Sequence, residues 1–142
     1  MSAWQKGVVA YGASLLVLAL AISAPPAAAD PLKQAAMASQ HAGLAAKAPD
    51  AKTTEMHLHH VINCLVGPGG DGFDASVGNP CKDLGNGGMR EATDVTQAKA
   101  MKLALRKANS GLRYLVKDWH RSQRYAAEAQ TALAPIVATA SK

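Results

Sequence analysis

Aromatic residues are scarce in this chain of 142 residues, which holds one Phe, two Trp and three Tyr, or 4% of the sequence. Alanine is abundant instead. Strands are enriched in aromatic and β-branched side chains, whereas alanine has the highest helix propensity of all residues. The composition therefore argues against a β-sandwich and predicts an all-α fold.

Long apolar runs are also scarce. The longest, Val8–Ile22, is mostly apolar but too short for a transmembrane helix, which needs about 20 apolar residues. Lys6 precedes it, and two prolines and Ala27-Ala28-Ala29 follow it, as in a cleavable secretory signal. We expect residues 1–29 to be the signal peptide and residues 30–142 to be one domain of a periplasmic or secreted protein, without stable membrane insertion. An uncleaved anchor is the alternative.

Cysteine occurs only twice, as Cys64 and Cys81. Neither has a C-x-x-C partner, which disfavours a thiolate metal site, although that reading stays open. In an oxidising compartment the default is a disulfide between the two. Closing such a short loop stabilises a domain by about 3 kcal/mol in the loop-entropy description.

Several catalytic signatures are missing from the sequence: a C-x-x-C-H haem motif, a nucleophile elbow, an H-E-x-x-H pair and a phosphate-binding loop. Carboxylates are too few in the expected helices for a di-iron centre. We therefore expect a protein that is not an enzyme and that binds no haem.

Acidic residues are sparse in the last third of the chain. Residues 30–98 contain five Lys or Arg and eight Asp or Glu, whereas residues 99–142 contain nine and two. A basic helix can mark a nucleic-acid-binding surface. In an exported protein such spacing is more often a solvated helix face, so no nucleic-acid partner is expected.

Four segments carry helical signals, and each begins with an aspartate suited to cap a first turn: Asp30, Asp50, Asp94 and Asp118. From Ala98 to Leu115, and again from Trp119 to Ile136, apolar and small residues recur at alternating spacings of three and four. This is the packing seam of four-helix bundles. The prediction is an antiparallel bundle of two helical hairpins, 31–66 and 94–138. A Gly-rich loop, 67–93, joins them, tethered by the disulfide.

Three of the five histidines crowd into the second expected helix, as His57, His59 and His60. At about 100° per residue, His57 and His60 share one flank of the helix and His59 points largely away. His41, in the first expected helix, is as far from the turn near Pro49 as His57 is. In an antiparallel hairpin these two residues therefore lie level.

Met37 falls nearly level with His60 by the same count. The predicted metal site thus comprises His41, His57, His60 and Met37. Imidazole and thioether donors together suit copper best, and imidazoles alone would also suit zinc or nickel. The alternative is that the histidines are interfacial side chains and Met37 fills the core. His120 is predicted to lie further along the bundle axis and to be a poorer ligand.

The stretch Gln40-His41-Ala42-Gly43-Leu44-Ala45-Ala46-Lys47-Ala48, with Asp50, His57 and His59-His60 after it, resembles a family of small exported helical proteins. This family is typified by the small metal-binding protein of nitrifying bacteria. The resemblance covers mainly residues 35–66 and implies a periplasmic four-helix bundle that takes up copper and other divalent metals. The family's regular histidine repeats are missing from residues 94–142, and the loop from Cys64 to Cys81 is additional. The resemblance therefore implies a single site at most.

Two functions follow as hypotheses. The first is a periplasmic protein that buffers or carries a metal ion, copper before nickel or zinc. The second is an exported helical interaction module that binds no metal and uses loop 67–93 to contact a partner protein of the envelope.

Overall fold

A computed structural model describes residues 28–140, apart from the side chain of Ala140. The predicted signal peptide, residues 1–29, lies almost wholly outside the described residues. Within them the chain forms helices and no strand, which confirms the all-α prediction. No helix among these residues is both long enough and apolar enough to cross a membrane. The elements are α1 (Pro31–Ala46), α2 (Ala51–Val66), the 3₁₀ turn η1 (Ala75–Val77), α3 (Gly88–Glu91), α4 (Val95–Tyr114) and α5 (Trp119–Ala140).

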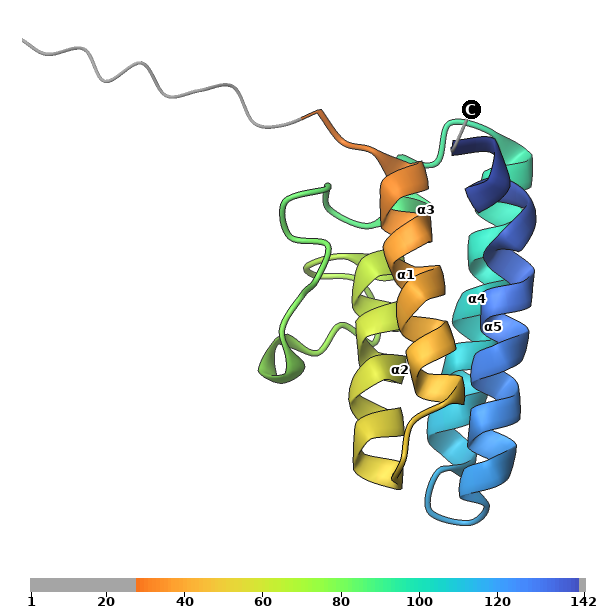
Figure 1. Ribbon diagram of the computed structural model, residues 1–142. Helices are drawn as coiled ribbons and strands as arrows, with labels where there is room; N and C mark the ends of the chain where they lie inside the picture. Colours follow the sequence, from red (N-terminus) through yellow and green to blue (C-terminus); the bar gives the residue numbers. More distant parts are fainter. Residues whose placement is uncertain (1–27, 141–142) are drawn as a thin grey trace, which may run out of the picture.

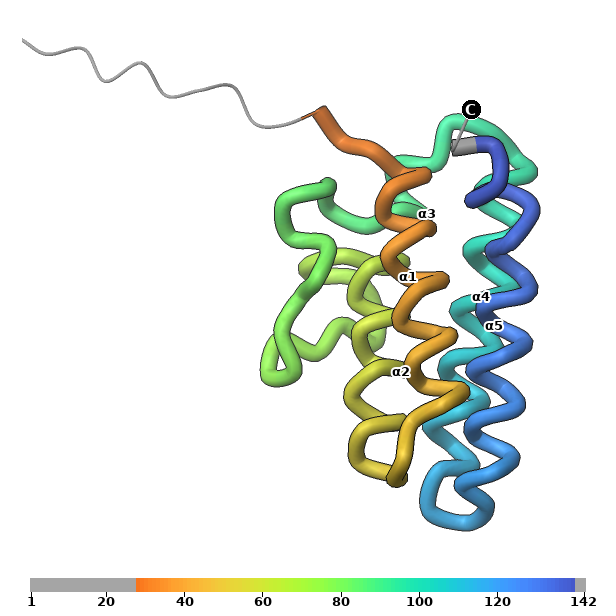
Figure 2. Tube along the Cα trace, in the orientation of Figure 1, coloured from red at the N-terminus to blue at the C-terminus, as the bar shows by residue number. Residues whose placement is uncertain are grey.

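The four long helices lie side by side (Figure 1). α1 packs most extensively against α5 and α2, and α4 packs against α5 and, less extensively, α2. The segment between α2 and α3 runs outside this group, beside α2, as the green part of the tube shows (Figure 2). The short helix α3 contacts α1, α2 and α4. The outer segment therefore covers the flank of α2, and its Cys81 is buried in the hydrophobic core.

Each long helix begins where an aspartate caps its first turn. The aspartates at 30, 50, 94 and 118 accept hydrogen bonds of 2.7 to 2.9 Å from backbone N–H groups two or three residues later: Lys33, Thr53, Thr96, Gln97 and Arg121. These N–H groups have no partner inside the helix, so the cap replaces the hydrogen bonds that the helix itself cannot supply. The predicted helix starts are thereby confirmed.

The core is built largely from small side chains. Four alanines of α1 and four of α4 and α5 are buried completely, which lets the helix backbones approach one another: Ala35, Ala38, Ala42, Ala45, Ala104, Ala108, Ala126 and Ala129. Leu58 of α2 is also fully buried, and a Cβ atom added at Gly111 of α4 would lie 2.9 Å from its Cδ1. Gly111 thus marks a close approach of α2 and α4. The indole of Trp119 donates to Thr54 Oγ1 over 2.8 Å and joins the starts of α5 and α2.

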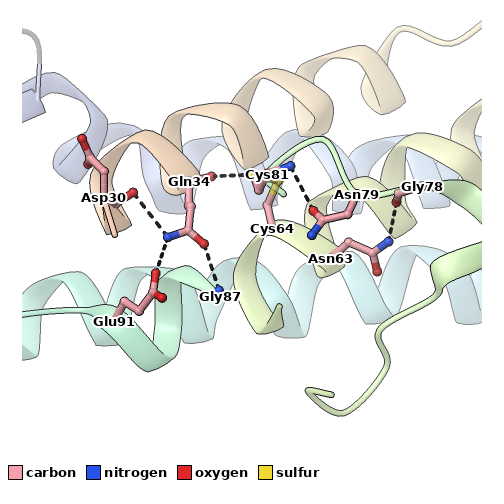
Figure 3. Close-up of a disulfide and its surroundings, with 9 residues drawn as sticks. All are labelled: Asp30, Gln34, Asn63, Cys64, Gly78, Asn79, Cys81, Gly87 and Glu91. Carbon is pink, nitrogen blue, oxygen red and sulfur yellow. Dashed lines mark hydrogen bonds between the residues drawn. A yellow bond between two sulfur atoms is a disulfide. The ribbon is translucent and has the colours of Figure 1, made fainter. Parts of the chain in front are cut away.

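The segment 67–93 is more ordered than the plain loop that was expected. Asp74 caps η1, and the short helix α3 follows at the far end of the segment. Buried Gln34 of α1 holds this end: its Oε1 accepts from Gly87 N at 2.9 Å and its Nε2 donates to Glu91 Oε2 at 2.6 Å (Figure 3). These contacts come from a distant helix, so local sequence signals could not reveal them.

Candidate metal site

Three histidines converge between α1 and α2. One ring nitrogen from each of His41, His57 and His60 lies within 4.8 Å of the others. His41 Nδ1 and His57 Nδ1 are 3.0 Å apart, and the ring of His60 meets that of His41 edge-on at a centroid distance of 4.6 Å. All three side chains are half-buried. The predicted convergence across the α1–α2 turn is therefore present, and the three histidines form a group that could hold a metal ion.

His60 is held by the outer segment. Its Nε2 lies 2.8 Å from the backbone oxygen of Val77, and because a carbonyl only accepts, Nε2 must carry the hydrogen. In the neutral ring, Nδ1 then keeps a free lone pair. This Nδ1 is buried and has no hydrogen-bond partner. An imidazole whose other N–H donates to a backbone carbonyl is the usual arrangement of a metal-binding histidine.

Two further side chains of α2 fix the segment that carries Val77. Cys64 is bonded to Cys81, which confirms the predicted disulfide; the two Cα atoms are 5.2 Å apart. Asn63 is fully buried, and its Nδ2 donates to Gly78 O at 2.7 Å (Figure 3). The same Nδ2 donates to Asp74 O at 2.7 Å, and Oδ1 accepts from Asp74 N at 2.8 Å. The backbone on both sides of Val77 is therefore attached to α2 one turn beyond His60.

The environment favours neutral imidazoles. Burial, and then the nearby charges of His60 and His57, lower the pKa of His41 to about 4. Burial and His60 also lower the pKa of His57. Because a metal ion binds the deprotonated nitrogen, protons compete weakly for His41 and His57 at neutral pH.

The remaining candidates lie elsewhere. Met37 is one helical turn before His41 and packs against the hydrophobic core, so its part as a ligand stays a prediction. His59 does not belong to this group and lines a separate pocket. His120 is exposed on α5, where its ring stacks on Trp119 and faces Gln123.

Sequence reasoning missed the two groups that support His60. The oxygen of Val77 belongs to the backbone and leaves no trace in the choice of residue. Asn63 did offer a signal, because an amide between the buried apolar residues Ile62 and Cys64 needs buried hydrogen-bond partners.

Comparisons with known proteins give no relative: no family model, no curated protein and no solved structure matches the chain. The likeness to the small metal-binding proteins therefore stays a prediction.

Replacing Asn63 by alanine is expected to destabilise the protein by about 2 to 4 kcal/mol, because three backbone groups lose their partner in a buried setting. The affinity for metal should fall about tenfold, since the Val77 carbonyl no longer holds His60. Urea unfolding and metal titration measure the two effects.

Asn109→Ala is the matched control: this exposed amide makes one hydrogen bond, to Leu105 O of its own helix, and its loss should change stability by less than about 0.5 kcal/mol. Equal stability of the two variants would contradict the role given to Asn63.

Acid should lower the stability of the metal-free protein, in part because His41 becomes protonated on unfolding. Its pKa is about 4 in the folded state and near 6.5 when unfolded, so below pH 6.5 the unfolded chain binds more protons. Stability is therefore lost as the pH falls from 6.5 towards 4, by about 1 to 2 kcal/mol after allowance for the partial exposure of the ring.

Two capping aspartates add to the loss of stability in acid. Hydrogen bonds donated by Thr53 to Asp50 and by Ser76 to Asp74 lower the pKa of both carboxylates. The His41 share is isolated by comparing wild type with His41→Gln in urea at pH 7 and pH 4.5, with chelator present. The variant should lose less stability than wild type. An identical loss in both proteins would show that His41 titrates normally.

Proposed function

We propose that this protein binds a transition-metal ion through His41, His57 and His60, with Met37 as a soft accessory ligand, and buffers or carries that ion in the periplasm. Copper is the first candidate, and nickel or zinc the alternatives. In this proposal the protein is a binding protein and not an enzyme. Its scaffold is a four-helix bundle of the hairpins 31–66 and 94–138, and its function resembles that of the small metal-binding proteins.

One observation carries the proposal. The buried Nδ1 of His60 has no hydrogen-bond partner, while Nε2 of the same ring is held by Val77 O. His60 also belongs to a group of three imidazoles, each with one ring nitrogen within 4.8 Å of the others. An unpaired buried polar atom is costly, and coordination of an ion would remove that cost. If the histidines had only a structural role, each buried ring nitrogen would be expected to have a neighbouring group as its hydrogen-bond partner.

Calorimetric titration of the purified, chelator-treated protein with copper, nickel and zinc tests the proposal. Binding tighter than about 10 µM by at least one of the three is expected. An ion that binds only the folded state must also raise the melting temperature; at 100 times its Kd it adds about 2.7 kcal/mol. If none of the metals binds and none raises the melting temperature, the interaction module that uses residues 67–93 is favoured instead.

A further inference from the structure

A pocket of about 560 Å³ lies between the first half of α2 and η1. None of the three clustered histidines lines it; its walls are Lys52, Thr53, Glu55, Met56, His59, Asp74, Ser76 and Val77. Two of these, His59 and Asp74, come from different elements and carry groups able to bind a cation. The side chains of His59 and Asp74 are 22% and 35% exposed, so both reach the surface of the pocket.

The two groups face each other at a distance that a hydrogen bond does not span. His59 Nδ1 is 3.9 Å from Asp74 Oδ2, and this nitrogen is buried without a hydrogen-bond partner. Zinc binds histidine nitrogen and carboxylate oxygen at about 2.0 to 2.2 Å with tetrahedral geometry, so two donors of one zinc ion lie about 3.3 to 3.6 Å apart. The observed separation exceeds this by about 0.3 to 0.6 Å, which a small rotation of either side chain removes.

Asp74 is held so that one of its oxygens stays free. Its Oδ1 accepts from both Ser76 N at 2.8 Å and Ser76 Oγ at 2.6 Å, and its backbone is fastened to Asn63. Oδ2 remains directed towards His59. A carboxylate oriented by hydrogen bonds to its other oxygen is typical of metal ligands.

We propose that His59 Nδ1 and Asp74 Oδ2 form a second cation site, separate from the histidine cluster. One imidazole, one carboxylate and water from the pocket make a donor set suited to a borderline divalent ion such as Zn²⁺. Glu55, one turn before His59 and in the same pocket, adds negative charge. With two protein ligands this site is weaker than the cluster, and it does not depend on the cluster binding metal.

Zinc titration of the full purified protein, followed by calorimetry and native mass spectrometry, tests this site. Asp74→Asn is the sharpest variant, because an amide oxygen can still accept both Ser76 hydrogen bonds while the anionic Oδ2 is lost. His59→Gln removes the other ligand, and His57→Gln damages only the cluster. Wild type should bind two zinc ions. Asp74→Asn and His59→Gln should each lower the affinity for the more weakly bound zinc ion about tenfold or more and leave the affinity for the tighter one unchanged. His57→Gln should do the reverse.

The outcomes separate the two sites. If Asp74→Asn and His59→Gln lose the more weakly bound zinc ion, the second site is supported. This holds even if His57→Gln leaves zinc binding unchanged and the cluster therefore binds no metal. A single zinc ion in wild type, lost in His57→Gln and retained in the other two variants, overturns it. So does a second ion that both pocket variants bind as tightly as wild type. In these cases His59 and Asp74 form at most an ion pair.

Discussion

Replacing His57 and His60 together by alanine is expected to weaken metal binding by at least about 100-fold. The change removes two of the three imidazoles whose nitrogens lie within 4.8 Å and leaves His41 alone on α1. Loss of a supporting group around a metal typically costs 10- to 100-fold in affinity, and loss of two direct ligands should exceed that. Calorimetric titration of the variant and the wild type with the tightest-binding metal measures the effect.

The control is His120→Ala, which deletes an exposed imidazole that faces only Gln123 and Trp119. Its affinity should stay within about twofold of wild type. Circular dichroism must show that both variants keep their helices, since His57 and His60 are half-buried. Unchanged affinity in the double variant would falsify the assignment of the cluster as the site.

Breaking the disulfide is expected to reduce stability strongly. Cys64 and Cys81 are 17 residues apart, and releasing such a loop costs about 3 kcal/mol in the loop-entropy description. For a domain of about 100 residues this lowers the melting temperature by roughly 10 to 20 °C. Comparing Cys64→Ser, Cys81→Ser protein with wild type by thermal and urea unfolding measures the loss. Metal affinity should fall too, because residues 74–81 then lose their covalent attachment to α2.

Reduced wild-type protein serves as the control for the serine side chains and should match the double variant. Thiol titration of unfolded but unreduced wild type should find no reactive cysteine, since the described residues contain no free one. A reduced protein that stays as stable as the oxidised one would mean that Asn63 and the other contacts hold the segment unaided.

Much of the fold could be predicted because it follows local rules. The aspartate caps depend on a few neighbouring residues, and the inward stripes from Ala98 and Trp119 depend only on helical period. The level placement of His41 and His57 follows from the turn near Pro49. Convergence of the histidines could be anticipated for the same reason.

The segment 67–93 could not be predicted in this way. It is rich in glycine and has no periodicity, and its shape is set by side chains distant in sequence: Gln34 on α1 and Asn63 on α2. The same is true of the pocket at His59, because Asp74 reaches it only once the segment has folded back on α2. The sequence therefore did not predict which residues of α1 and α2 hold the glycine-rich segment 67–93.

The contact that orients His60 uses the backbone of residue 77 and not its side chain. Exchanging Val77 for another residue that keeps the same backbone path should therefore leave His60 in place. Adding or deleting a residue between Asp74 and Cys81 would displace the carbonyl itself, because both ends of this stretch are attached to α2. The site is thus tolerant of changes in the composition of this stretch and sensitive to changes in its length.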